Sequence, residues 1–353
     1  MSWIKKIAQG LAYLLLLIVC VAVLLEVIFR ILPTTSPIDL EPITSEREIL
    51  RFKADQTANF SLGVDFYRTV TKRTNNDGFY SDFDYEKEKS PNIVIIGDSY
   101  VEATQIETID TVGEVIKAMD NKQSVYQMGV SGVALSHYIK MVDYAKRNYL
   151  PRHFVILIVG NDFDNSLCDY RIKLGTWCFD ENFELKFIPF NGYEGIRRYA
   201  KASAFMRFLV FQARIDWRLV MASIGLYTQE IKPVDKYAGN VERFKDQEKL
   251  EKSFKVVDRF MEELKKLQIT DKVTLVIDAD RQDIYNKQRS ESYFQKMRGY
   301  TISSASSNQI KLIDMAPIFE KDYNANGIKF EFPTDGHWNE RAHKLLAEAL
   351  IGN

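Results

Sequence analysis

Asn92-Ile-Val-Ile-Ile-Gly-Asp-Ser-Tyr-Val-Glu102 is the stretch that decides the fold of this 353-residue chain. Its apolar run, Ile93 to Ile96, is typical of a strand buried on both faces of a parallel sheet. The run stops at Gly97-Asp98-Ser99, and a helix is expected from about Tyr100. In open α/β sheets, ligands bind at the carboxyl ends of the strands, and helix N-termini favour negative charge. A serine at this junction is well placed for chemistry, although Asp98 and Ser99 could equally serve only as helix caps.

The same alternation of strand and helix continues along the chain. Apolar runs predict four more strands, and helical spacing of apolar residues predicts helices between them. The strands are expected at 124–128, 154–159, 273–277 and 311–314, and the helices at 111–119, 135–145, 254–267, 293–303 and 340–350. This order is typical of a parallel sheet with crossover helices. We therefore expect an α/β fold with a parallel sheet of about five strands.

The N-terminus is expected to be a membrane anchor. Residues 10–29 are nearly all apolar, with Glu26 as the only charge, and about 20 such residues span a bilayer. Lys5 and Lys6 precede this stretch, so the positive-inside rule places the N-terminus in the cytoplasm and the rest of the chain outside it. The alternative is a signal peptide cleaved near Cys20-Val21-Ala22, but the apolar run continues well beyond that point.

The segments of the chain differ in pattern. Residues 1–32 are predicted to be the cytoplasmic N-terminus and transmembrane anchor, and residues 33–90 a stem and N-terminal extension. Residues 91–353 are predicted to be the catalytic domain. Its regular pattern breaks at about 163–246, which we interpret as an insertion rich in aromatic residues and Arg, with a helix expected over 205–217.

Composition excludes several classes of function. The formal net charge of −1 does not favour nucleic-acid binding, and there is no Walker loop, no dinucleotide Gly-x-Gly-x-x-Gly motif and no zinc-type cysteine spacing. No cofactor or metal is therefore expected. Of the three cysteines, Cys20 lies in the apolar stretch. Cys168 and Cys178 could form a disulfide outside the cytoplasm or remain reduced.

Four polar positions are expected to meet at one edge of the sheet. Ser99, Gly132, Asn161 and His337 each follow a strand or lie in a loop before a helix. A serine, a histidine base and an orienting carboxylate are sufficient for nucleophilic acyl chemistry. Asp335 is the candidate carboxylate, while Gly132 and Asn161 could donate hydrogen bonds to an oxyanion.

Other acidic residues and histidines lie near strand ends or on the helices. Asp278 and Asp280 also end a strand at this edge, so either is an alternative acid. His137, His153 and His343 are expected to be packing or surface residues.

These blocks resemble those of the SGNH hydrolases, the GDSL-like esterase superfamily. The matching stretches are Gly97-Asp98-Ser99, Gly129-Val130-Ser131-Gly132, Gly160-Asn161-Asp162 and Asp335-Gly336-His337. The resemblance implies a flavodoxin-like three-layer α/β/α sandwich, with Ser99 as nucleophile and His337 as base. It also implies that the backbone N–H of Ser99 belongs to the oxyanion hole.

The last block departs from the usual pattern, because one residue rather than two separates Asp335 from His337. This Asp-x-His-Trp form resembles membrane-associated polysaccharide O-acetyltransferases. We therefore expect an anchored, extracytoplasmic serine esterase or acyltransferase that acts on O-acetyl groups of a glycan. The related systems imply a membrane-bound O-acyltransferase as partner. The alternatives are a non-catalytic glycan-binding or assembly subunit of the same fold, and a lipase or lysophospholipase.

Overall fold

The computed structural model describes residues 2–41, 43–44, 47–87, 89–170, 175–189, 201–213, 215, 217–223, 236–237, 241–242 and 244–352. The chain divides into two units. The smaller comprises residues 1–37, 58–71 and 193–231, and the larger comprises residues 38–57, 72–192 and 232–353. Parts of the expected insertion, including residues 190–200 and 224–235, lie outside the described residues.

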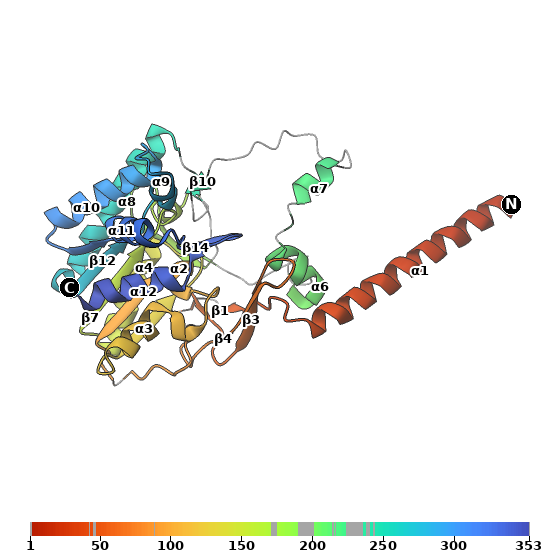
Figure 1. Ribbon diagram of the computed structural model, residues 1–353, viewed down its shortest axis with the longest axis horizontal. Coiled ribbons are helices and arrows are strands. Elements are labelled where there is room, and N and C mark those ends of the chain that lie inside the picture. Colours follow the sequence, from red (N-terminus) through yellow and green to blue (C-terminus); the bar gives the residue numbers. More distant parts are fainter. Residues whose placement is uncertain are drawn as a thin grey trace. The chain divides into compact units, whose positions relative to one another are not determined.

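A five-stranded parallel sheet forms the centre of the larger unit (Figure 1). Its strands are β5 (Ile93–Gly97), β6 (Val125–Gly129), β7 (His153–Ile158), β12 (Val273–Ile277) and β13 (Lys311–Asp314). They lie in the order β13-β12-β7-β5-β6, and every neighbouring pair is parallel. Counted along the chain, this is the 2-1-3-4-5 order of a flavodoxin-like sheet. The expected fold class is confirmed.

Helices cover both faces of this sheet. On one face, α3 (Val112–Met119), α11 (Met315–Asn326) and α12 (Glu340–Ile351) pack on side chains such as Ile95, Val155 and Val276. On the other, α4 (Leu135–Tyr149), α8 (Gln247–Lys266) and α10 (Tyr293–Ser307) pack together, with α4 against β5 and β7 and α10 against β13. Alternate strand residues point to opposite faces. This explains why β5 and β7 read as continuous apolar runs.

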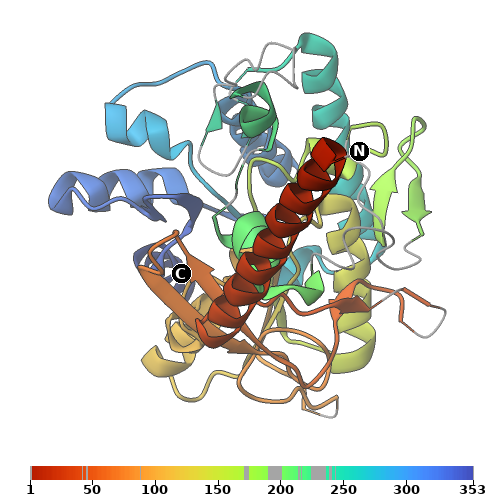
Figure 2. The ribbon, with the colours of Figure 1, turned by 90° about the vertical axis from the view of Figure 1, so that its right-hand side faces the viewer.

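The remaining elements of the larger unit are short. They are β1 (Leu40–Glu41), β2 (Arg51–Phe52), α2 (Ser99–Glu102), η1 (Thr108–Asp110), η2 (Asp164–Ser166), β8 (Thr176–Phe179), β9 (Leu185–Ile188), β10 (Lys236–Tyr237), β11 (Val241–Glu242), η4 (Thr270–Lys272), α9 (Arg281–Asn286), β14 (Glu331–Phe332) and β15 (Asp335–Trp338). A disulfide joins Cys168 to Cys178 of β8. Figure 2 shows β8 and β9 as a separate hairpin beside the helices.

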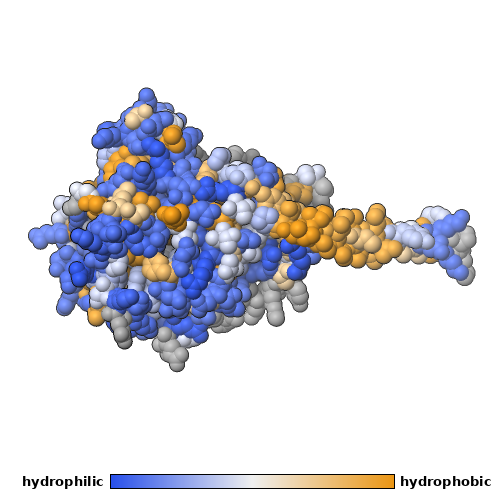
Figure 3. All heavy atoms as spheres, turned by 60° about the horizontal axis from the view of Figure 1, so that its bottom comes forward, coloured by the Kyte–Doolittle hydropathy of each residue, from blue (hydrophilic) through white to orange (hydrophobic). Residues whose placement is uncertain are grey.

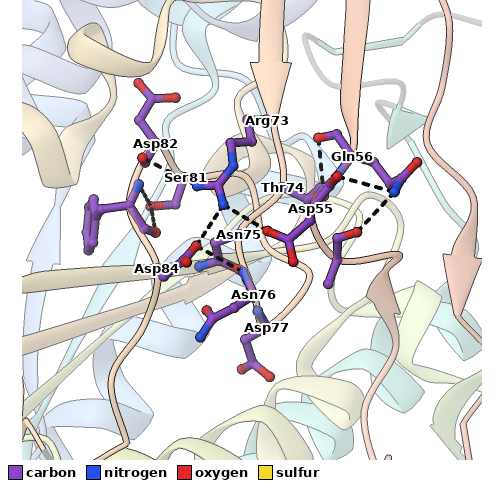
Figure 4. Close-up of polar contacts among 12 residues, drawn as sticks. Asp55, Gln56, Arg73, Thr74, Asn75, Asn76, Asp77, Ser81, Asp82 and Asp84 are labelled. Atoms are coloured by element: carbon purple, nitrogen blue, oxygen red, sulfur yellow. Dashed lines mark hydrogen bonds and ion pairs between the residues drawn. The ribbon is translucent and has the colours of Figure 1, made fainter.

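The N-terminal extension contributes to the larger unit in two ways. Arg73, at the end of β4 (Arg68–Arg73), donates hydrogen bonds to Asp55 at 2.8 Å and to Asp84 at 2.9 Å (Figure 4). Further along, the Tyr85 hydroxyl donates to the carbonyl of Gln127 at 2.7 Å and accepts from its N–H at 2.8 Å. Gln127 lies on the edge strand β6, so Tyr85 satisfies backbone groups that would otherwise be open to another strand.

The smaller unit contains α1 (Ser2–Ile31), β3 (Thr57–Leu62) with the first residues of β4, α6 (Ala204–Arg207), η3 (Phe208–Gln212) and α7 (Trp217–Ser223). Its α1 is the one helix of the described chain that is long and apolar enough to cross a membrane. Figure 3 shows it as a rod whose surface is mainly apolar.

Two sequence expectations need correction. The helix expected over 205–217 ends earlier than predicted. It begins as α6 and continues as the π-helix η3, which ends at Gln212; in η3 the N–H of Ala213 donates to the Phe208 carbonyl at 2.7 Å. The wider turn carries the buried Gln212, whose amide donates to the carbonyl of Gly63 at 2.8 Å. His337 does not lie in a loop but within β15, which pairs with β14.

His343 of α12 makes the stability of the fold depend on pH. The residue is 1% exposed, and among the described residues neither ring nitrogen has a hydrogen-bond partner. Burial, with a smaller effect of the Lys72 charge, lowers the pKa of His343 to about 3. Between this value and the unfolded pKa of about 6.5, only the unfolded chain binds the proton, so stability is lost as the pH falls through this window.

We expect the His343 contribution to fall by about 2 kcal/mol between pH 7.5 and pH 5. Denaturant unfolding of the detergent-solubilised protein at the two pH values measures this loss. Over the same change in pH, the free energy of unfolding of the His343→Phe variant should fall by about 2 kcal/mol less than that of the unchanged protein. Equal losses in the two proteins would show that His343 is not the group responsible.

Candidate active site

The turn after β5 fixes the position of Ser99. Asp98 caps α2, because its carboxylate accepts the N–H of Tyr100 at 3.0 Å, and Ser99 is the first residue of the helix. At Gly129, the last residue of β6, a Cβ atom would overlap the backbone of Val101 and Glu102. The helix therefore packs directly on the end of the neighbouring strand, and only glycine allows this approach.

Ser99, His337 and Asp335 form a continuous hydrogen-bonded relay. Nε2 of His337 lies 2.8 Å from Oγ of Ser99. The Asp335 carboxylate contacts Nδ1 of the same ring and also accepts the backbone N–H of His337 at 3.0 Å. The structure thus brings together the three residues singled out in the sequence, and the Asp-x-His spacing does not prevent the contact between Asp335 and His337.

A buried arginine supports the hairpin that carries His337, and no sequence pattern marks it. Arg281, at 0% exposure, donates to the carbonyl of Gly336 at 2.8 Å and to the hydroxyl of Tyr100 at 2.9 Å. It also donates to Glu331 of β14 at 2.9 Å. Both strands of the hairpin and the residue after Ser99 therefore meet at one guanidinium group. Its one sequence signal is its position just after strand β12. Ligands bind at the carboxyl ends of the strands in such sheets, and Asp278 and Asp280 are candidates for the same reason.

The two alternative acids serve other purposes. The Asp278 carboxylate accepts the indole N–H of Trp338 at 3.0 Å and lies 3.5 Å from the guanidinium of Arg281. Asp280 caps α9 and accepts the hydroxyl of Ser292 at 2.8 Å. Asp335, by contrast, contacts the imidazole directly, so it is the acid that can orient His337.

The expected oxyanion donors lie around Asp98. Oδ2 of Asp98 is 3.3 Å from Oγ of Ser99 and 3.5 Å from Nδ2 of Asn161, which places the amide beside the serine. Burial raises the pKa of Asp98. The N–H of Ser99 is the first of α2, and helices leave such groups without an intrahelical partner.

Gly132 belongs to a loop held against α2. The N–H of Val130 donates to the carbonyl of Gly97 at 3.3 Å, and the N–H of Ser131 donates to the carboxylate of Glu102. Gly132 itself has φ +73°, a conformation that favours glycine. Glu102 is buried and lies on the same short helix as Ser99, so one element carries the serine and fixes the Gly132 loop.

Asp162 fixes the turn that carries Asn161. Its carboxylate accepts the N–H of Val159 at 2.8 Å and the hydroxyl of Tyr138 at 3.0 Å. Burial, aided by the nearby charge of Asp98, raises the pKa of Asp162 well above its usual range. Asp162 therefore supports the turn that carries Asn161 through its hydrogen bonds to Val159 and Tyr138.

The chemistry available here is that of an activated hydroxyl with hydrogen-bond donors beside it. An imidazole at hydrogen-bond distance can take the serine proton, and a carboxylate on its other nitrogen can stabilise the resulting charge. Among the described residues, no three His, Cys, Asp or Glu side chains are grouped so that they could hold a metal ion.

Comparison with known proteins gives structural likenesses only. No family model and no curated protein matches the chain. The chain is similar to the acetyl xylan esterase AlAXEase, with a TM-score of 0.40 and 13% identity over 74% of this chain and 98% of that one. It is also similar to a lipolytic protein of the G-D-S-L family from Veillonella parvula DSM 2008, with a TM-score of 0.38 and 13% identity over 74% and 96% of the two chains. A third similar structure is the lipase/acylhydrolase from Enterococcus faecalis, with a TM-score of 0.37 and 11% identity over 74% and 93%. At these values the residues of the chain itself have to support any statement about its function.

Replacement of Arg281 should slow the reaction of Ser99 with a fluorophosphonate. Arg281→Met removes one of the two donors to the Gly336 carbonyl, the other being the Tyr100 hydroxyl at 3.0 Å, and also the bond to Glu331. A shift of about 1 Å in a reacting group can cost about 10²-fold in rate. Arg281→Lys keeps the charge but lacks the planar fork of donors, so we expect an intermediate rate. The rate of labelling, followed on a gel at equal amounts of folded protein, measures both effects.

Arg298→Met is the matched control. Arg298 lies on α10 and donates a hydrogen bond to Asp314, at the end of β13, at 2.8 Å. It should label at the rate of the unchanged protein. If Arg281→Met did the same, the guanidinium would have no part in positioning His337.

Replacement of Glu102 should affect the same reaction through the Gly132 loop. Glu102→Ala leaves the N–H of Ser131 without this acceptor, and we expect the reaction to be at least about 10-fold slower. The effect should be smaller than the roughly 10²- to 10³-fold cost of removing an oxyanion donor itself. Glu102→Gln keeps an acceptor oxygen and should be faster than Glu102→Ala. Glu114→Ala, at a partly exposed pair with Lys117, is the control. Equal rates for Glu102→Ala and the control would contradict the proposed role of the carboxylate.

Proposed function

We propose that the chain is a membrane-anchored serine ester hydrolase or acyltransferase of the SGNH type, acting outside the cytoplasm on O-acetyl groups of a glycan. The observation that carries the proposal is the relay from Ser99 through His337 to Asp335, with 2.8 Å between Oγ and Nε2. The surrounding strand order and glycine turns are those that such a site requires.

In the first half of the proposed reaction, Ser99 becomes acylated. Its Oγ attacks the ester carbonyl while Nε2 of His337 takes the hydroxyl proton, and Asp335 stabilises the imidazolium. The backbone N–H groups of Ser99 and Gly132 and the amide of Asn161 stabilise the oxyanion of the tetrahedral intermediate. The intermediate collapses when the C–O bond to the alcohol breaks and His337 returns the proton to that leaving oxygen.

In the second half, an acceptor hydroxyl attacks the carbonyl of the acyl-enzyme while His337 takes its proton. The bond between the acyl carbon and Oγ of Ser99 then breaks, and His337 returns the proton to Oγ, which restores the free serine. Water as acceptor gives hydrolysis, and a sugar hydroxyl gives transfer to a glycan. The same residues serve both outcomes. In the transferase case, a membrane-bound O-acyltransferase is the proposed partner that supplies acetyl groups.

The location and substrate have separate support. Lys5 and Lys6 lie in the first turns of α1, before its apolar stretch, which favours a cytoplasmic N-terminus and an external catalytic unit. The disulfide between Cys168 and Cys178 is of a kind that persists in oxidising compartments. The Asp335-Gly336-His337-Trp338 block, with its resemblance to polysaccharide O-acetyltransferases, favours an acetylated glycan as substrate.

The proposal is tested with the full-length protein in detergent micelles. We expect it to react with a fluorophosphonate and to release acetate from an acetylated polysaccharide, and we expect Ser99→Ala to abolish both. Ser307→Ala, at an exposed serine at the end of α10, should leave both unchanged. Released acetate and labelled protein are quantified in parallel.

The possible outcomes separate the alternatives. Labelling without acetate release, combined with release of fatty acid from a lysophospholipid, would replace the glycan by a lipid substrate. Folded protein that neither labels nor releases any acid would leave a non-catalytic glycan-binding or assembly subunit.

A further inference from the structure

The end of α1 lies at a predictable depth in a bilayer. The helix has 30 residues, which at 1.5 Å per residue is about 45 Å, longer than the hydrocarbon core of about 30 Å. Lys6 and Glu26 delimit the uncharged stretch between them. The turn from Glu26 to Arg30 is therefore expected where hydrocarbon gives way to lipid headgroups.

A second segment of the chain is fastened to this turn. The carboxylate of Glu26 accepts the hydroxyl of Ser203 at 2.7 Å and the N–H groups of Ala204 and Phe205 at 3.0 and 3.2 Å, so it caps α6. Arg30 lies 2.8 Å from the same carboxylate. Glu26 is thus paired and hydrogen-bonded, as a charge at the boundary of a membrane requires.

Aromatic stacking reinforces this attachment. The ring of Phe29 lies 4.2 Å from that of Phe208 and 5.4 Å from that of Phe205, measured between centroids. Phe66, in the turn between β3 and β4, stacks on Phe208 at 5.8 Å. The two other segments of the smaller unit, β3–β4 and α6–η3, therefore meet at the end of α1.

The stem after α1 is not a free linker. The hydroxyl of Thr34 donates to the carbonyl of Phe29 at 2.8 Å. The hydroxyl of Thr35 accepts from the N–H of Ser61 on β3 at 3.0 Å, and both threonines are buried. We call residues 58–71 and 201–213 the collar; its hydrogen bonds and stacked rings fix its depth relative to residues 26–30.

The collar exposes apolar and aromatic side chains. Val64 is 66% exposed, Tyr67 43% and Val210 38%. Tyr and other amphipathic side chains are enriched where the membrane meets water, and short segments with such residues bind at this level without spanning the bilayer.

We propose that the collar is a lipid-binding surface that lies in the headgroup layer of the membrane crossed by α1. The inference rests on the membrane anchoring in the proposed function but not on catalysis. Its occupant is the bilayer itself, because the collar is continuous with the membrane-spanning helix and is bonded to its last turn. The collar also supplies hydrogen-bond donors to the Glu26 carboxylate at the membrane boundary.

The test uses the full-length protein in nanodiscs, in a Cys20→Ser background that keeps the disulfide. A fluorophore is attached in separate variants at Val210→Cys in the collar, at Leu16→Cys in the span and at Met119→Cys in the larger unit, all exposed positions. Lipids carry a quencher either near the headgroup or deep in the acyl chain. We expect the label at 210 to lose fluorescence mainly with the shallow quencher and the label at 16 mainly with the deep one. The label at 119 is the reference: if it lost as much fluorescence with the shallow quencher as the label at 210, that quenching would not be specific to the collar and the inference would be wrong.

The outcomes distinguish the inference from the proposed function. If the label at 16 is quenched and the label at 210 is not, the collar does not contact lipid and the inference is wrong. If the label at 16 is not quenched either, the anchoring itself is wrong. Adding Glu26→Ala should reduce shallow quenching at 210 but not deep quenching at 16, whereas Glu26→Gln, which keeps an acceptor, should have less effect. Unchanged quenching at 210 in Glu26→Ala would show that Glu26 does not hold the collar.

Discussion

The hydrogen bond between Ser99 and His337 joins residues that are 238 positions apart, and the rest of the larger unit holds its two ends in place. The serine end is rigid for a local reason, since a buried strand passes through one turn into a helix that packs on β6. The histidine end has no such local support. It lies on a two-stranded hairpin, β14–β15, and isolated hairpins of this size are marginal in water. The 2.8 Å contact therefore requires bonds from outside the hairpin.

Arg281 supplies two of those bonds, to Gly336 and Glu331, and Tyr100 and Asp278 supply others to Gly336 and Trp338. Buried ion pairs often contribute little net stability compared with well-packed apolar groups. Here, however, the guanidinium links the two strands of the hairpin, because it donates to the carbonyl of Gly336, which also accepts the Tyr100 hydroxyl at 3.0 Å, and to the carboxylate of Glu331. Asp278 at 3.5 Å and Glu331 at 2.9 Å balance its charge. The cost of burying the arginine is thus tied to the placement of the imidazole.

What could be predicted from the sequence was whatever depends on neighbours along the chain. The buried strands, the glycine turns after them and the positions of Ser99, Asn161 and His337 follow from short patterns of residue type. The role of Arg281 depends on a hairpin 50 residues further on, and no periodicity marks it. The π-helix at 208–212 likewise depends on contacts of Phe208 and Gln212 with distant residues. Sequence patterns therefore indicated which groups meet at the candidate site, while the groups that position them needed coordinates.

Asp98 raises one further question, because it offers the hydroxyl of Ser99 a second acceptor. A hydroxyl has one proton, and Oδ2 of Asp98 at 3.3 Å competes for it with Nε2 of His337 at 2.8 Å. The carboxylate already accepts the N–H of Tyr100 at 3.0 Å and faces the amide of Asn161 at 3.5 Å, so it does not need the serine. Burial raises the pKa of Asp98, although the hydrogen bonds to Tyr100, Asn161 and Ser99 oppose this effect. The shorter distance therefore favours His337 as the acceptor of the serine proton, which is the direction that nucleophilic attack requires.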